Sequence, residues 1–110
     1  MKKKLMVLFL AGSLLSFGTA GFAKETEKGK SGGELFQQHC SACHPDGGNI
    51  VNPQKTLHKK DLDANKIKKP GDIVNKMRHP APGMTQFDKK TVSDADAKKI
   101  ASYILKTFKY

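Results

Sequence analysis

Apolar side chains recur at a helical period near the C-terminus, which predicts an amphipathic helix there. The helix is expected to begin near Ser93 and Asp94, and its apolar stripe would form ordinary core. Acidic residues lie at its start and basic residues at its end, as the helix dipole favours. The stripe consists of Ala97, Ile100, Ala101, Ile104, Leu105 and Phe108.

An earlier helix is predicted to begin at Ser31, because Ser31 and Glu34 have the spacing of a capping box. The two apolar residues that follow supply its buried face, and we expect the helix to run into the segment 40–44. Gly32 and Gly33 are poor helix formers. Their place near the helix start therefore suggests a close backbone approach to the C-terminal stripe.

The pattern between these two helices is weaker. A short helix is expected over residues 61–68, and Pro70 is expected to open another that continues to Met77, because proline suits a first helical position. Residues 78–84 contain two prolines and a glycine, which oppose a helix or a central strand. This segment is predicted to be a loop that presents Met84. The predicted fold class is all-α.

The first 23 residues have the organisation of a secretory signal peptide. Lysines at 2–4 are followed by an apolar segment at 5–17 and by Gly21-Phe22-Ala23, in which small residues stand at the first and third positions as at a cleavage site. The alternative is an uncleaved anchor, since residues 5–23 are just long enough to span a bilayer. Cleavage is the better interpretation, and it predicts a periplasmic protein with no membrane anchor.

The only two cysteines of the chain lie in the run Cys40-Ser41-Ala42-Cys43-His44. This is the attachment signature of c-type haem, because the two thiols can bond to the two vinyl groups of one porphyrin and the histidine can ligate the iron. A zinc site would need a second pair of ligands, and a redox dithiol would need a βαβ pattern that the sequence lacks. One covalent haem is therefore expected, and it would also form the centre of a thin core.

The sixth ligand of the iron would decide what such a protein does. Met84 is the best candidate, because it lies on a stiff loop forty residues after the histidine of the motif. Met77 lies on the apolar face of a predicted helix and is expected in the core. His79 is expected to be solvated, and His39 and His58 are expected to be surface residues rather than ligands.

These residues together resemble the class I c-type cytochromes, and most closely the small soluble cytochrome c-six branch that carries electrons in algal and cyanobacterial photosynthesis. The resemblance implies thioether bonds from Cys40 and Cys43, His44 and Met84 as axial ligands, and terminal helices that cross. The matching segments are Gly32 to Phe36, Cys40 to His44, Gly47-Gly48-Asn49, Lys55-Thr56-Leu57, Met84 to Phe87, Ser93-Asp94 and Tyr103.

The resemblance implies a monomeric, monohaem cytochrome c domain over residues 31–110. Residues 24–30 are charged and include no apolar residue, so they are expected to form a flexible lead-in. Its function would be one-electron transport with both axial positions filled, and not enzymatic catalysis. The alternative is a haem enzyme, or a gas or redox sensor, with a displaceable sixth ligand. Thr85 follows Met84 where the family often has proline, and the charge is basic where many members are acidic. A photosynthetic role is therefore not implied.

The charge of the chain suggests a class of partner. The formal net charge is +10, and removal of the three lysines of the signal peptide leaves 17 basic and 10 acidic residues, or +7. A basic stretch at residues 55–78 would orient an acidic redox protein, or would serve solubility alone. Nucleic acid is not an expected partner of an exported protein. The basic stretch contains Lys55, Lys59, Lys60, Lys66, Lys68, Lys69, Lys76 and Arg78.

Overall fold

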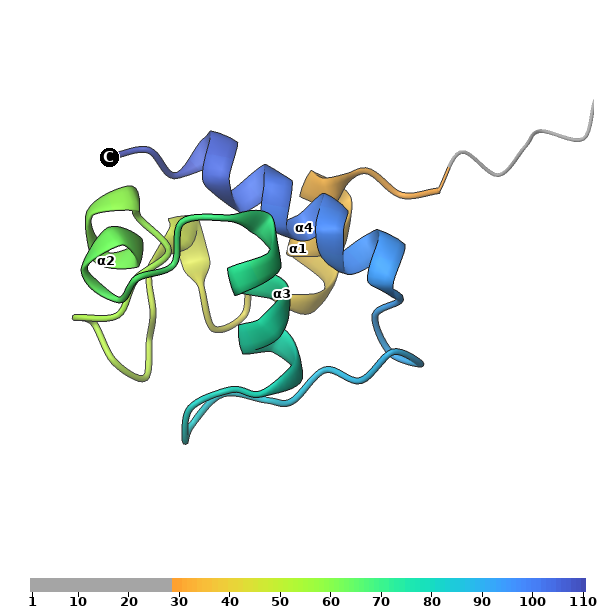
Figure 1. Ribbon diagram of the computed structural model, residues 1–110, viewed down its shortest axis with the longest axis horizontal. Helices are drawn as coiled ribbons and strands as arrows, with labels where there is room; N and C mark the ends of the chain where they lie inside the picture. Colours follow the sequence, from red (N-terminus) through yellow and green to blue (C-terminus); the bar gives the residue numbers. More distant parts are fainter. Residues whose placement is uncertain (1–28) are drawn as a thin grey trace, which may run out of the picture.

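The computed structural model describes residues 29–110, and within this range every regular element is helical (Figure 1). The prediction of an all-α fold is therefore confirmed. The signal peptide and most of the lead-in lie outside the described residues. None of the helices within 29–110 has the length and apolar character needed to cross a membrane. The elements are α1 (Gly32–His39), the 3₁₀ turn η1 (Pro45–Gly47), α2 (Lys59–Ala64), α3 (Pro70–Arg78) and α4 (Asp94–Thr107).

Helix α1 begins with the predicted capping box. The Ser31 Oγ accepts the Glu34 N–H at 3.2 Å, and the Glu34 carboxylate accepts the Ser31 N–H at 2.7 Å. The helix ends at His39, one residue before the cysteine motif that it was expected to enter. Cys40 is its C-cap, with its N–H bonded to the Phe36 carbonyl at 2.8 Å, and the motif continues as a turn.

Helices α1 and α4 cross at the two glycines of α1 (Figure 1). A Cβ atom on Gly32 would lie 2.3 Å from the Lys99 carbonyl oxygen, and one on Gly33 would lie 3.1 Å from the Tyr103 ring. The predicted close approach is confirmed, because only glycine leaves room for α4 here. The Phe36 ring then packs on Tyr103, with ring centroids 5.4 Å apart.

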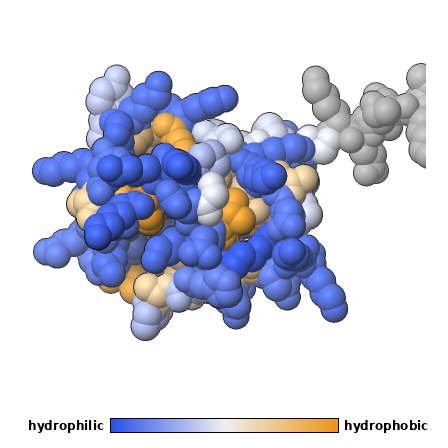
Figure 2. All heavy atoms as spheres, in the orientation of Figure 1, coloured by the Kyte–Doolittle hydropathy of each residue, from blue (hydrophilic) through white to orange (hydrophobic). Residues whose placement is uncertain are grey.

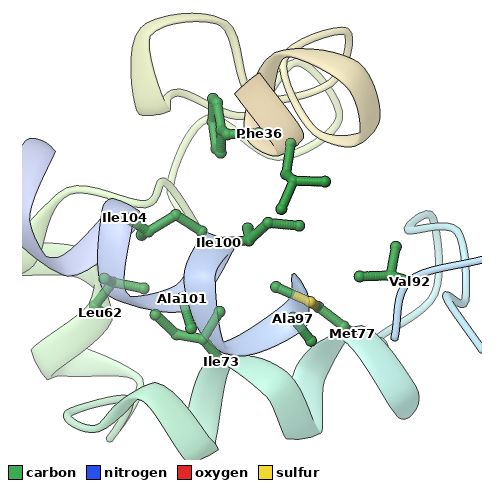
Figure 3. Packing of buried hydrophobic residues seen from close by; sticks show 10 residues of the cluster. Phe36, Leu62, Ile73, Met77, Val92, Ala97, Ile100, Ala101 and Ile104 are labelled. Atoms are coloured by element: carbon green, nitrogen blue, oxygen red, sulfur yellow. The ribbon is translucent and has the colours of Figure 1, made fainter. Parts of the chain in front are cut away.

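The core lies between α4 and the two helices packed on it, α1 and α3 (Figure 3). Four residues of the predicted stripe are buried, and its last two, Leu105 and Phe108, are partly buried at the edge. Met77 belongs to this core, as predicted. The buried residues are Leu35, Phe36, Leu62, Ile73, Met77, Val92, Ala97, Ile100, Ala101 and Ile104.

The middle helices agree only partly with the predicted bounds. Helix α3 begins at Pro70 as expected. Helix α2 begins two residues before the predicted 61–68 segment and ends four residues before its end. The early end has a local cause, because Asn65 caps the helix and Lys66 has a φ of +59°, a left-handed conformation that helices adopt where they stop.

The segment of residues 79–93 between α3 and α4, which we call the Met84 loop, contains no helix, as its prolines predicted. It leaves the end of α3, turns, and returns to the start of α4 (Figure 1). At the turn the Met84 N–H bonds to the Ala81 carbonyl at 3.3 Å, and Gly83 has a φ of +94°. The turn thus depends on glycine directly before the candidate ligand.

Candidate functional site

A cavity of about 290 Å³ gathers all four predicted site residues, Cys40, Cys43, His44 and Met84. The motif and the methionine come from segments far apart in the chain, and they meet because α1 and α3 both pack on α4 while the Met84 loop folds back on α3. Most of the cavity wall between them is apolar. The apolar lining residues are Val51, Leu57, Leu62, Ile67, Ile73, Met77, Ala81, Pro82, Phe87 and Ile104.

The two cysteines lie on a single turn at the end of α1. The Cys43 and His44 N–H groups both point to the Cys40 carbonyl, at 3.2 and 2.9 Å. Both thiols are free, and Cys40 is half-buried whereas Cys43 is exposed. Burial, and next the nearby Cys43, raises the pKa of the Cys40 thiol to about 11. A redox dithiol needs a thiol of lowered pKa, so this environment disfavours that alternative.

His44 has one ring nitrogen held by the backbone. Its Nδ1 lies 2.7 Å from the Gly48 carbonyl oxygen, so Nδ1 carries the proton and donates it to that carbonyl. The lone pair then resides on Nε2, the arrangement found when a histidine ligates a metal. The η1 turn places this carbonyl, and it requires Gly47, whose φ is +79° and whose Cβ would lie 2.6 Å from the Phe108 ring.

The two methionines of the described region differ in burial. Met84 lines the cavity and is 38% exposed. Met77 also lines it but is only 4% exposed, and its side chain points into the core beside Ala97 (Figure 3). A sulfur packed in the core is not available as a ligand without repacking. The geometry therefore favours Met84 over Met77.

The other histidines were expected at the surface, which is right for one of them. His79 is exposed. His39 is half-buried, lines the cavity, and meets the Phe87 ring edge to face at 6.1 Å. His58 is also half-buried, because it packs edge to face on Phe108 at 5.9 Å. An apolar neighbour from a distant part of the chain covers each ring, which adjacent residues could not reveal.

Sequence reasoning assigned no structural role to Asn49. Its side-chain oxygen accepts the N–H groups of Val51 and Asn52, both at 2.9 Å, and its amide donates to the Lys55 carbonyl at 2.8 Å. These bonds fold the loop that forms one wall of the cavity. Asparagine directly after two glycines is a turn signal that could have indicated this role.

The cavity has the chemistry that a c-type haem needs. It offers two free thiols, one imidazole with a defined tautomer, a thioether, and an apolar wall suited to a porphyrin. Polar groups suited to the porphyrin carboxylates also line it. These are Asn49, Asn52, Lys55, Thr56, Asn65 and Lys76. Among residues 29–110, no three side chains of His, Cys, Asp or Glu are grouped as they would be in a metal site of that kind.

The sequence is similar to known haem proteins. Residues 27–104 match the family described as cytochrome C oxidase, cbb3-type, subunit III. Cytochrome c6 of Synechocystis sp. is 35% identical over 98 residues, which cover 89% of this chain and 78% of that protein. Cytochrome c6 of Pyropia yezoensis is 35% identical over 107 residues, which cover 96% and 94%.

Solved structures give the same result for the fold. OmcF, the outer membrane cytochrome F of Geobacter sulfurreducens, is 45% identical with a TM-score of 0.69, over 71% of this chain and 99% of that one. Cytochrome c6C of Synechococcus sp. PCC 7002 is 26% identical with a TM-score of 0.67, over 72% and 95%.

Proposed function

The chain belongs to the class I c-type cytochromes, in the cytochrome c6 branch, and on this basis we propose that it is a periplasmic one-electron carrier with His44 and Met84 as iron ligands. The protein carries one covalently bound haem c and is an electron-transfer protein, not an enzyme. When bound, this haem supplies an iron centre that gains and loses one electron.

Cys40 and Cys43 are the proposed attachment residues. They are the only cysteines of the sequence, and the turn after α1 holds both of them at the cavity. His44 is the proposed proximal ligand, because the bond from Nδ1 to Gly48 keeps the ring oriented and leaves Nε2 as the coordinating atom.

The observation that carries the assignment of Met84 is its place in the cavity together with the motif. Two side chains as axial ligands leave no position at which a substrate must bind or leave, which suits a carrier. Histidine with methionine also favours the reduced iron. An apolar wall around the iron would reinforce this preference.

The proposed location follows from the N-terminal segment, and the proposed partner follows from the distribution of charge. Residues 1–23 would direct export and be removed, leaving a soluble periplasmic protein. The face in Figure 2 is largely hydrophilic, with apolar side chains visible only in small areas. We assign the exposed lysines of the basic stretch to the docking of an acidic redox protein. Arg78 is not among them, because its side chain is only 13% exposed.

The test compares Met84→Leu with Met77→Leu in the haem-loaded protein. Leucine matches methionine closely in volume, so Met77→Leu should cost less than about 1.5 kcal/mol in the core, whereas Met84→Leu also removes the proposed bond to iron. Met84→Leu should abolish the weak far-red band of methionine bound to ferric iron and lower the reduction potential markedly. Met77→Leu should leave band and potential nearly unchanged. The reverse result would show that Met77 is the ligand.

A further inference from the structure

We propose that Arg78 is a positioning residue that closes the base of the Met84 loop and thereby keeps Met84 at the cavity. The inference rests on the proposed ligation by Met84. Arg78 is the last residue of α3, and the Met84 loop begins directly after it. Its charge is therefore used inside the fold rather than on the basic surface.

The guanidinium of Arg78 ties together three points of the chain. Its Nη1 donates to the Phe87 carbonyl at 3.0 Å and to the Val92 carbonyl at 2.9 Å, and its Nη2 donates to the Asp94 carboxylate at 2.9 Å. One planar group thus joins α3, both ends of the returning segment of the loop, and the first residue of α4. The fixed fork of an arginine side chain suits such a joint.

The returning segment also bonds to the end of α3. The Phe87 N–H donates to the Met77 carbonyl at 2.9 Å, and the Gln86 side-chain amide donates to the Arg78 carbonyl at 2.8 Å. The last carbonyls of a helix have no partner within the helix, so the loop supplies what α3 lacks. In Figure 1 the outgoing and returning parts of the loop accordingly run close together.

These bonds divide the Met84 loop into two parts, residues 86–93, which the bonds hold against α3 and α4, and a short tip of residues 79–85. While these bonds are formed, they leave only residues 79–85 free, and Met84 is among these residues. Without the Arg78 side chain the bonds from Gln86 and Phe87 to the carbonyls of α3 remain, but residues 87–94 lose their three bonds to the guanidinium, so the free segment would extend toward residue 93 more readily. A longer free segment has more conformations to lose when Met84 ligates, so the methionine would compete less well with another ligand.

The carbonyl bonds should matter more than the ion pair. Asp94 has a side chain that is 58% exposed, and it also pairs with Lys89 at 3.4 Å. Exposed ion pairs contribute little because water and salt screen them. The bonds to Phe87 and Val92 come instead from a side chain that is only 13% exposed, where screening is weaker.

The test is a titration of the ferric, haem-loaded protein with imidazole, which competes with Met84 and abolishes the far-red band. Arg78→Lys keeps the charge but places a single point donor where a fork is needed, and it should bind imidazole at least about tenfold more tightly, a change of about 1.4 kcal/mol. Arg78→Gln should behave in the same way, and it serves if the lysine variant does not fold. Asp94→Asn should stay within about twofold of the unsubstituted protein, because the carbonyl bonds remain.

The control is Ile100→Val, which weakens the α4 core but removes none of the Arg78 hydrogen bonds. It should lower the unfolding temperature without changing the affinity for imidazole, so that a general loss of stability is separated from loop opening. Wild-type imidazole affinity in both Arg78 variants would overturn this inference alone, and so would an equal gain in Asp94→Asn. Absence of the far-red band from the unsubstituted protein would overturn the ligation by Met84 and this inference together.

Discussion

Gly32 shows how one missing side chain decides the approach of two helices. A Cβ atom there would lie 2.3 Å from the Lys99 carbonyl oxygen and 2.9 Å from the Cβ of Tyr103. Gly71, in the first turn of α3, has nothing within 4 Å of the same construction. Both glycines lie in helices, where alanine is intrinsically favoured. An alanine at Gly71 therefore tests helix propensity alone, whereas an alanine at Gly32 also tests the packing of α1 on α4.

We predict opposite effects of the same substitution at these two sites. Gly32→Ala should destabilise the protein by about 1–3 kcal/mol, because the backbone of α4 has to move. Gly71→Ala should stabilise it by about 0.4–1 kcal/mol, because the unfolded chain loses freedom while the helix loses nothing. Denaturant unfolding of the haem-loaded proteins measures both values. Equal midpoints for Gly32→Ala and the unsubstituted protein would contradict the close crossing of α1 and α4.

Single residues were predictable from sequence where the signal is local. The pairing of Ser31 with Glu34 needs only their spacing, and the structure has it. Arg78 is the opposite case, since its partners lie 9, 14 and 16 residues away along an irregular segment. In the sequence it is one more charge in a basic stretch, and no periodicity indicates that the fold buries it.

At the scale of an element, the start of α3 depends on Asp72. One oxygen of its carboxylate accepts the N–H groups of Lys68 and Lys69, both at 3.0 Å. These two backbone bonds hold the pKa of Asp72 below its ordinary value of 3.8. A carboxyl whose pKa is lowered by folding stabilises the fold while it is charged, and this contribution disappears as the pH falls through the lowered pKa.

The expected result is a pH-dependent effect of Asp72→Asn. The variant should be less stable than the unsubstituted protein near neutral pH, and the difference should shrink as the pH falls below 3.8 and through the lowered pKa of Asp72. Unfolding by denaturant at a series of pH values measures the difference, in which effects common to both proteins cancel. A difference that stays constant over this range would mean that the charge of Asp72 does not stabilise α3.

The bounds of a helix could be predicted where residues at its ends signal them. Pro70 and Ser93 are local signals, and α3 and α4 begin where they indicate. Helix α2 has no such signal: its N-cap His58 makes no side-chain capping bond, and the end depends on Lys66 adopting a left-handed φ. A lysine in that conformation is held by its surroundings, so the sequence could not reveal the boundary.

At the scale of the whole molecule, the distribution of charge predicts how the protein meets its partner. We expect Lys60, Lys66 and Lys76 to steer an acidic redox protein, and we expect Lys98, Lys106 and Lys109 to be neutral in this respect. All six are exposed. The first three lysines belong to the basic stretch, and one of them, Lys76, lines the cavity. The other three lie on α4 or shortly after it.

Replacement of each group by glutamine lowers the net charge by the same amount, so the two triple variants control for each other. The Lys60, Lys66 and Lys76 variant should transfer electrons to an acidic partner more slowly at low salt and with a weaker dependence on ionic strength. Exposed charges act over roughly 10 Å at 0.1 M salt and contribute little to the fold, so the unfolding temperature should hardly change. Equal rates and equal salt slopes for both variants would show that the basic stretch serves solubility.

The cavity itself shows what a sequence can predict of a whole site. The motif 40–44 and the loop with Met84 could each be recognised alone, because each is contiguous. The two segments meet because α1 and α3 both pack on α4. The hydrophobic pattern does not indicate this packing, and only the resemblance to a family suggested it. The wall formed around Asn49 depends on three bonds within one irregular loop, and no period of apolar residues predicts such a loop.

The crossing of α1 and α4 also affects the order in which the protein folds. The residues that meet at Gly32 are separated by most of the folded chain, and α4 follows the other helices of residues 29–110 in chain order. Until residues 94–107 are free to fold, the apolar face of α1 lacks its partner α4, and the cysteines at its end remain on an open chain. Completion of the fold is thus a late event, and the attachment motif stays accessible until the final helix docks.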